Sequence, residues 1–81
     1  MVDNANLKRE IQPMQDDVHE ALVQRGLTAE YEARPAYQRN DYLGWIARAR
    51  RESTRQKRLQ QMLEELAAGG VYMNMPHRPS R

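Results

Sequence analysis

The sequence predicts an all-α fold, a small bundle of three main helices plus a short helical turn, with disordered termini. Apolar residues recur at helical spacing in the second half of the chain, and Gly and Pro stand where helices would begin and end. No sustained alternation of apolar and polar residues competes with this pattern. Only 40% of the 81 residues are apolar, with one Trp, four Tyr and no Phe, so we expect one small domain with a thin core.

The first helix is expected to begin after Pro13, because Asp16 and Asp17 suit the positive end of a helix. Gly26 directly follows Arg25, which is the usual order of a basic last turn and a glycine stop. The short apolar stripe between these two signals predicts the side that faces the core. It consists of Val18, Ala21, Leu22 and Val23.

Pro35 separates two further helical elements. Proline disfavours helical geometry in the residue before it, here Arg34. A short turn of helix at Thr28 to Ala33 must therefore end before Pro35. Proline is favourable at a first helical position, so Pro35 also opens the next helix, which we expect from about Ala36 to Arg50. Its apolar residues form one broad arc, and Trp45 is expected to be the largest piece of the core. They are Tyr42, Leu43, Trp45, Ile46, Ala47 and Ala49.

The last helix has the clearest helical period in the chain. Ser53 followed by Gln56 matches a capping box, so we expect this helix to begin at Thr54. Gly69 and Gly70 end it. Between these signals, apolar residues recur at i, i+3, i+4, i+7 and i+8. They are Leu59, Met62, Leu63, Leu66 and Ala67.

The chain is therefore divided into a flexible N-terminal segment at 1–13, a helical domain at 14–70 and a disordered tail at 71–81. In the tail, a brief strand-like run from Val71 to Met75 is cut short by Pro76. No apolar run resembles a signal peptide or approaches the roughly 20 residues that cross a bilayer. We expect a cytoplasmic protein without membrane insertion.

Residue types that carry chemistry are sparse. The absence of Cys excludes disulfides, thiolate zinc sites and cysteine nucleophiles. Asp16, His19 and Glu20 have a metal-like spacing, but a site would need further converging ligands, and a solvated helix start explains the same residues. Glu64 and Glu65 are adjacent on a helix, so they point about 100° apart and cannot form a carboxylate pair. The sequence therefore indicates no catalytic residue, no metal site and no cofactor.

The strongest polar signal is a basic block in the middle of the chain, where residues 39–58 carry seven cations and two acids. Arg39, Arg50 and Arg55 fall inside the apolar arcs of their helices, so we expect their stems to lie along the core. The remaining cations form a candidate binding patch for nucleic acid or an acidic ligand, although the pattern favours a solvated, partly structural basic corner. Aromatic residues are scarce among them, which argues against single-stranded nucleic acid. The candidate patch consists of Arg48, Arg51, Lys57 and Arg58.

Two stretches of the basic half resemble a known family. The run RPAYQRNDYLGWI at 34–46 is followed by Ala49-Arg50 and then by STRQKRL at 53–59. In order and spacing this resembles the helical C-terminal region of the bacteriocin-protection proteins, the YdeI/OmpD-associated family, over about Ala21 to Gly70. The residues that match the family motif are Arg39, Tyr42, Leu43, Trp45, Ile46, Ala49, Thr54, Arg55 and Arg58.

Departures from the family pattern limit what the resemblance implies. Ala36 stands where the family usually has a capping Ser, Arg50 replaces Lys, and Ser53 replaces the common Glu. Many relatives also carry a separate domain ahead of this region, and activity in such a domain is not carried over. The resemblance implies a helical accessory module of bacteria, linked to bacteriocin and antimicrobial-peptide tolerance and to an outer-membrane porin. It brings no catalytic residue, and apart from Arg58 we expect the matching residues to be structural.

Together these observations favour a non-enzymatic helical interaction module with an unidentified protein partner, connected with bacteriocin tolerance and envelope stress. The alternative is a protein whose basic patch binds nucleic acid weakly or binds another acidic ligand.

Overall fold

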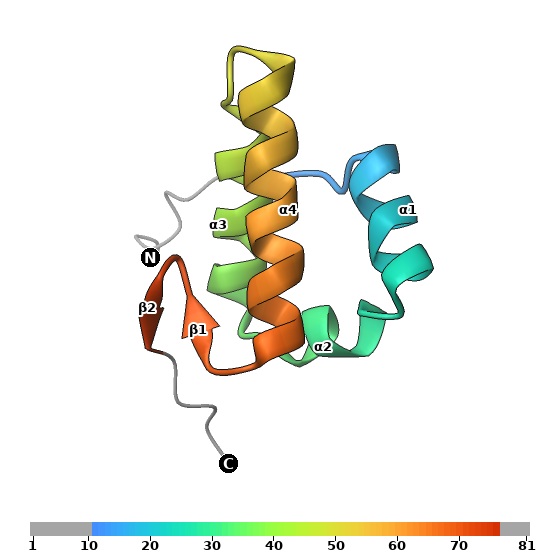
Figure 1. Cartoon of the computed structure of the whole chain (residues 1–81), viewed down its shortest axis with the longest axis vertical. Helices are drawn as coiled ribbons and strands as arrows, with labels where there is room; N and C mark the ends of the chain where they lie inside the picture. The colour runs from blue at the N-terminus through green and yellow to red at the C-terminus, as the bar shows by residue number, and fades with distance from the viewer. Residues whose placement is uncertain (1–10, 77–81) are drawn as a thin grey trace, which may run out of the picture.

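A computed structural model describes residues 11–76, which form four helices and a small β-hairpin (Figure 1). The longest helix, α4, lies between α3 and α1 and also contacts α2 and β1 (Figure 1). The hairpin lies beside the C-terminal half of α4 (Figure 1). The elements are α1 at Asp16–Arg25, α2 at Thr28–Ala33, α3 at Ala36–Ala47, α4 at Glu52–Ala68, β1 at Val71–Tyr72 and β2 at Met75–Pro76.

The prediction of an all-α fold is wrong at the C-terminal end. The chain is mainly helical, but residues 71–76, expected in a disordered tail, form an antiparallel hairpin in which Val71 pairs with Pro76. Its turn residues, Met73 and Asn74, have φ values of 52° and 64°. A two-residue type I′ turn needs positive φ at both central positions, and Gly or Asn usually supplies it. Because the first of these positions is a methionine, the sequence pattern did not indicate the turn.

The two ends of the chain lie partly outside the description. Residues 77–81 of the expected tail and residues 1–10 of the expected flexible segment are not among the described residues. Residues 11–13 have no helix or strand. Here the Gln12 backbone N–H donates a hydrogen bond to Asn40 Oδ1 at 2.6 Å, which places this segment beside α3.

The first two helices end as predicted. Gly26 adopts a left-handed conformation with φ 67°, and its N–H group donates to the carbonyls of Leu22 and Val23. The α2 helix ends one residue before Arg34, which is in an extended conformation ahead of Pro35.

The predicted boundary between α3 and α4 is wrong on both sides. The α3 helix ends at Ala47 instead of Arg50, and α4 begins at Glu52 instead of Thr54. Ser53 lies within the first turn and forms no cap, since the N-cap position belongs to Arg51. Glu52 is instead the first residue of α4, where a negative charge is favourable. Its carboxylate accepts a hydrogen bond from Gln56 Nε2 at 2.7 Å. Residues 48–51 are therefore a connection between helices.

The core consists of apolar residues from all four helices and the connection that precedes α2. Tyr42 is the largest fully buried side chain and is 0% exposed. Trp45, expected to hold that place, is only partly buried and packs against the rim of the core. Arg58 covers the face of the indole ring, with its guanidinium carbon 5.2 Å from the ring centre. The buried apolar residues are Val18, Leu22, Leu27, Tyr31, Tyr42, Leu43, Ile46, Leu59, Met62, Leu63 and Leu66.

Candidate functional site

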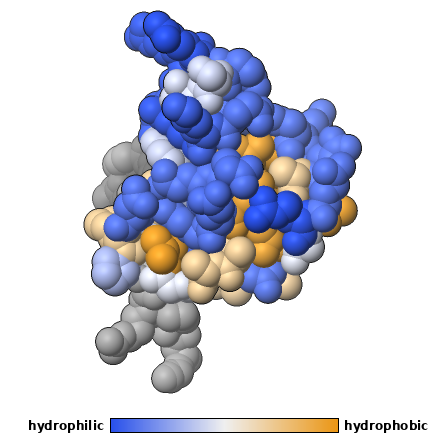
Figure 2. Space-filling model, viewed as in Figure 1, coloured by the Kyte–Doolittle hydropathy of each residue, from blue (hydrophilic) through white to orange (hydrophobic). Residues whose placement is uncertain are grey.

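The α3–α4 connection carries a concentration of exposed positive charge. Figure 1 shows this connection at one extremity of the molecule, and Figure 2 shows strongly hydrophilic residues gathered there. We call the four exposed cations of this region the basic end: Arg48, Arg50, Arg51 and Lys57. Within residues 11–76 no ion pair joins any of them to an acidic side chain. Arginine and lysine are charged at neutral pH, so among the described residues the basic end is a localised patch of positive charge.

Two cations differ from their predicted roles. Arg50 was expected along the core but is exposed, because α3 ends before it. Arg58 was expected in the binding patch but is partly buried, and its Nη1 donates to the Trp45 carbonyl at 2.6 Å. This hydrogen bond and the stacking on the indole stabilise the C-terminal end of α3 against α4. Arg58 is therefore a structural residue at the base of the basic end.

Arg48 is exposed but lies back against its own helix at Gly44. A Cβ atom added to Gly44 would lie 2.9 Å from Arg48 Nη1 and 3.2 Å from Gln12 Cγ. The absence of a side chain at this buried glycine thus allows both the guanidinium and the N-terminal segment to approach α3.

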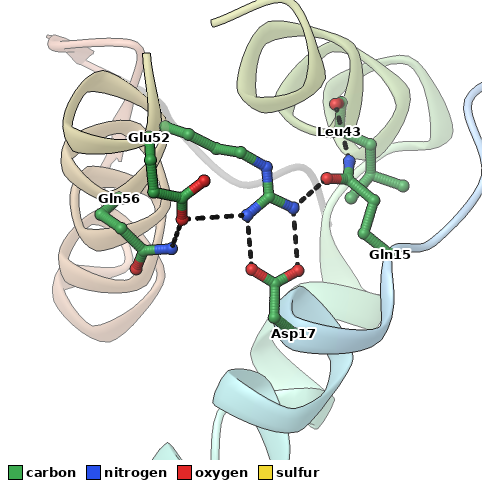
Figure 3. Close-up of polar contacts among 6 residues, drawn as sticks. Gln15, Asp17, Leu43, Glu52 and Gln56 are labelled. Carbon is green, nitrogen blue, oxygen red and sulfur yellow. Dashed lines mark hydrogen bonds and ion pairs between the residues drawn. The ribbon is translucent and has the colours of Figure 1, made fainter.

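Arg55 of α4 bonds directly to Asp17 of α1 and, through Gln15, connects to Leu43 of α3; Figure 3 shows these contacts. Its guanidinium donates two hydrogen bonds to Asp17 of α1, with Nη1 2.5 Å from Oδ2 and Nη2 2.8 Å from Oδ1. It also donates to Gln15 Oε1, while Gln15 Nε2 donates to the Leu43 carbonyl at 3.4 Å. The hydrogen bond from Arg55 outweighs desolvation and lowers the pKa of Asp17. This bidentate pair fixes α1 against α4, as Figure 3 shows.

The other family-motif residues are mainly structural. Arg39 Nη1 donates to the carbonyls of Glu32 and Arg34, each at 2.9 Å, and so satisfies the C-terminal end of α2. Tyr42, Leu43 and Ile46 belong to the core, whereas Ala49 and Thr54 are partly buried beside the connection.

A second polar cluster lies at the opposite end of α4 and was missed by sequence reasoning. Glu65 is only 5% exposed, and its carboxylate accepts hydrogen bonds from one side-chain hydroxyl, one side-chain amide and two backbone N–H groups. The donors are Tyr42 OH at 2.5 Å, Gln61 Nε2 at 2.9 Å, Met73 N at 2.7 Å and Asn74 N at 2.9 Å. Burial alone would raise the pKa of Glu65, but these hydrogen bonds, led by the one from Tyr42, lower it. Burial and the neighbouring Glu65 together raise the pKa of Tyr42.

Arg34 completes this second cluster. Its Nη2 donates to the carbonyl of Glu65 at 3.0 Å and to that of Val71 at 2.8 Å, while its Nη1 donates to Gln38 Oε1 at 3.2 Å. Arg34 and Gln38 are 6% and 1% exposed. One signal was available in the sequence, because Glu65 lies three residues after Met62 and one before Leu66, at the border of the apolar stripe.

Other kinds of site find little support in the described part of the chain. A hollow of about 240 Å³ beside α3, lined in part by Tyr31, Arg39 and Leu43, is smaller than a typical ligand pocket. Residues 11–76 bring no three His, Asp or Glu side chains together in a way that could hold a metal ion. Among the described helices, none has the length and apolar character that a membrane span needs.

Comparison with known proteins supplies the family. A family model described as "Bacteriocin-protection, YdeI or OmpD-Associated" matches residues 13–69. No curated protein and no solved structure matches the chain. The matched residues include all four helices and the basic end, and stop two residues before β1. This finding confirms the resemblance seen in the sequence, and the chain belongs to the bacteriocin-protection, YdeI/OmpD-associated family.

Proposed function

We propose that this protein is a cytoplasmic, non-enzymatic interaction module that supports bacteriocin protection by binding an acidic partner protein through its basic end. The observation that carries the proposal is the concentration of exposed cations at Arg48, Arg50, Arg51 and Lys57 without an ion-pair partner in residues 11–76. The family description supplies the link to bacteriocin protection.

The surroundings of the basic end suit binding by charge complementarity. The Arg55–Asp17 pair and the Arg58–Trp45 contact hold the helices beneath it in place. A guanidinium can bind a carboxylate through two parallel hydrogen bonds, which adds geometric specificity to charge attraction. Opposite charge also accelerates association in a salt-dependent way. An acidic loop or helix with several carboxylates is therefore the partner of matching chemistry.

Nucleic acid is a poorer match to the same surface. Specific duplex binding typically buries at least about 600 Å² of protein and uses several phosphate contacts. Single-stranded binding needs aromatic faces on which bases stack, and the Trp45 ring is instead covered by Arg58. The four cations nevertheless attract phosphates, so weak binding is expected.

Survival under bacteriocin challenge tests the proposal directly. Cells lacking the gene would be complemented with the parent, with the Arg48→Gln, Arg50→Gln, Arg51→Gln, Lys57→Gln variant, or with a matched variant carrying Lys at the three arginine positions. We expect the parent to restore survival, the Gln variant to fail although it folds, and the Lys variant to restore it in part. Full protection by the Gln variant would contradict the proposal.

Titration with fluorescent oligonucleotides tests the competing assignment. We expect duplex binding no tighter than about 10 μM at near-physiological salt, with a log-log salt slope near −3 to −4 for about four phosphate contacts. Submicromolar binding that the Gln variant loses would replace the acidic protein partner with nucleic acid.

A further inference from the structure

The C-terminal hairpin depends on the helices for its position. Each of its strands has two residues, and an isolated two-stranded hairpin of any length is at best marginally stable in water. All eleven buried apolar side chains of the core lie between Val18 and Leu66, and the hairpin adds only the partly buried Tyr72 and Met73. Most apolar contacts of the core are therefore made among the helices, whereas the hairpin has few apolar contacts without the helices.

A small set of contacts fixes the hairpin against the helices, and Glu65 makes the central ones. Its two carboxylate oxygens accept from the backbone N–H groups of Met73 and Asn74, the two turn residues with positive φ. Successive N–H groups held in this way form a concave anion-binding arrangement. Here the anion is a side chain of the same molecule, and it holds the turn at the point where the chain reverses.

Further ties lie on either side of this carboxylate. Arg34 holds the Val71 carbonyl, and Tyr72 OH donates to Asp41 Oδ2 at 2.7 Å. The ring of Tyr72 makes edge-to-face contacts with Tyr37 and Tyr42, with centroids 6.1 Å and 5.4 Å apart. The closed hairpin therefore covers Tyr42 and the neighbouring part of α3.

We propose that the hairpin is a releasable strap whose latch is the ionised Glu65 carboxylate. While Glu65 is ionised, the turn amides, Tyr42 and Gln61 all donate to it and the strap is closed over α3. When Glu65 is neutral, one of its oxygens becomes a hydroxyl that donates a hydrogen and accepts only weakly, so the turn amides lose part of their attachment. The strap then opens as a unit while α1–α4 remain folded.

The groups around Glu65 decide the pH at which this happens. Tyr42 and Gln61 donate to the carboxylate, and the positive charge of Arg34 lies at its main-chain carbonyl. Asp41 holds Tyr72 as an independent tie that also depends on a carboxylate. Because these donors lower the pKa of Glu65, the latch stabilises the closed strap above about pH 4.3, the ordinary value for glutamate. That stabilisation is lost as the pH falls through the lower folded-state pKa.

Amide hydrogen exchange of the full chain tests the latch. In Glu65→Gln we expect exchange at Met73 and Asn74 to accelerate at least tenfold, while amides of Leu63 and Leu66 keep their protection. Glu64→Gln is the matched control, since it changes an exposed neighbour on the same helix and should leave hairpin exchange at the parent rate. Unchanged hairpin protection in Glu65→Gln, or equal loss of protection in the helices, would overturn the proposal.

An acid titration of the parent keeps the test valid if Glu65→Gln does not fold. Resonances of Met73 and Asn74 should shift with a midpoint below pH 4.3, before the helical circular dichroism signal at 222 nm falls. If hairpin and helices respond together, the strap is not an independent unit and the inference is wrong.

Discussion

The two ends of α4 use charged residues in opposite ways. At the N-terminal end, Arg51 and Lys57 are exposed and join no acidic side chain within residues 11–76. At the C-terminal end, Glu65 and the nearby Arg34 are almost fully buried, and both side chains make several hydrogen bonds. An exposed charge stays hydrated and contributes little to folding, whereas a buried charge is tolerated only when its hydrogen bonds are complete. We therefore expect substitutions at the C-terminal end of α4 to change stability, and substitutions at the N-terminal end to change binding.

The largest expected effect separates the core from its rim. Tyr42→Ala removes the largest fully buried side chain and the donor nearest to Glu65, so we expect it to lower the free energy of unfolding by about 3–5 kcal/mol. Trp45→Ala removes a partly buried ring and should cost about 1–2 kcal/mol. Urea denaturation of both variants gives the comparison, and equal losses would place Trp45 back in the core.

The next effect compares two arginines directly. Arg34→Ala removes a hydrogen-bond donor from each of three acceptors near Glu65, and we expect the free energy of unfolding to fall by about 1–3 kcal/mol. Arg51→Ala at the other end of α4 should remain within about 0.5 kcal/mol of the parent. Thermal unfolding followed at 222 nm measures both, and a larger loss for Arg51→Ala would reverse the roles of the two ends.

A smaller effect concerns the pair beneath the basic end, and it depends on pH. Arg55→Ala removes the bidentate contact with Asp17, which should cost about 1 kcal/mol at neutral pH because Asp17 is partly solvated. The lowered pKa of Asp17 means that this contribution is complete above about pH 4 and disappears as the pH falls below it. Unfolding free energies measured between pH 2.5 and 6 should converge for parent and variant in acid. A constant difference across this range would contradict the assignment.

The smallest effect on stability is expected at the basic end itself. Arg48→Gln and Lys57→Gln should each change the free energy of unfolding by no more than about 0.5 kcal/mol. If either change destabilises the protein by more than 1 kcal/mol, the residue has a structural contact that competes with a role in binding.

Local signals accounted for much of the helical architecture. Gly26, Pro35 and Gly69 mark real helix ends, and the apolar period of α4 matches its buried face except at Ala67, which is exposed. The α3–α4 boundary was misplaced because a capping-box pattern at Ser53 competed with the favourable position of Glu52 in a first turn. Arg50 was misassigned because α3 ends at Ala47, three residues before it.

The Glu65 cluster depends on contacts between residues far apart in the sequence. Tyr42 and Glu65 are 23 residues apart, and Arg34 and Val71 are 37 apart. Sequence periodicity places each residue on a face of its own helix but does not state which faces meet. The hairpin was missed with it, since its turn lacks glycine and its amides are bonded to a carboxylate on the preceding helix.

Gly44 shows how a position without a side chain can govern an exposed one. Alanine there would favour the helix by up to about 1 kcal/mol, because glycine is a poor helix former. Its methyl group would also displace the guanidinium of Arg48, a flexible group that yields at little energetic cost. Selection for thermal stability would therefore tend to accept this exchange, while selection for partner recognition would oppose it. If directed evolution is run under the two pressures in parallel, we expect the selected sequences to differ at the buried position 44 before they differ at the arginines.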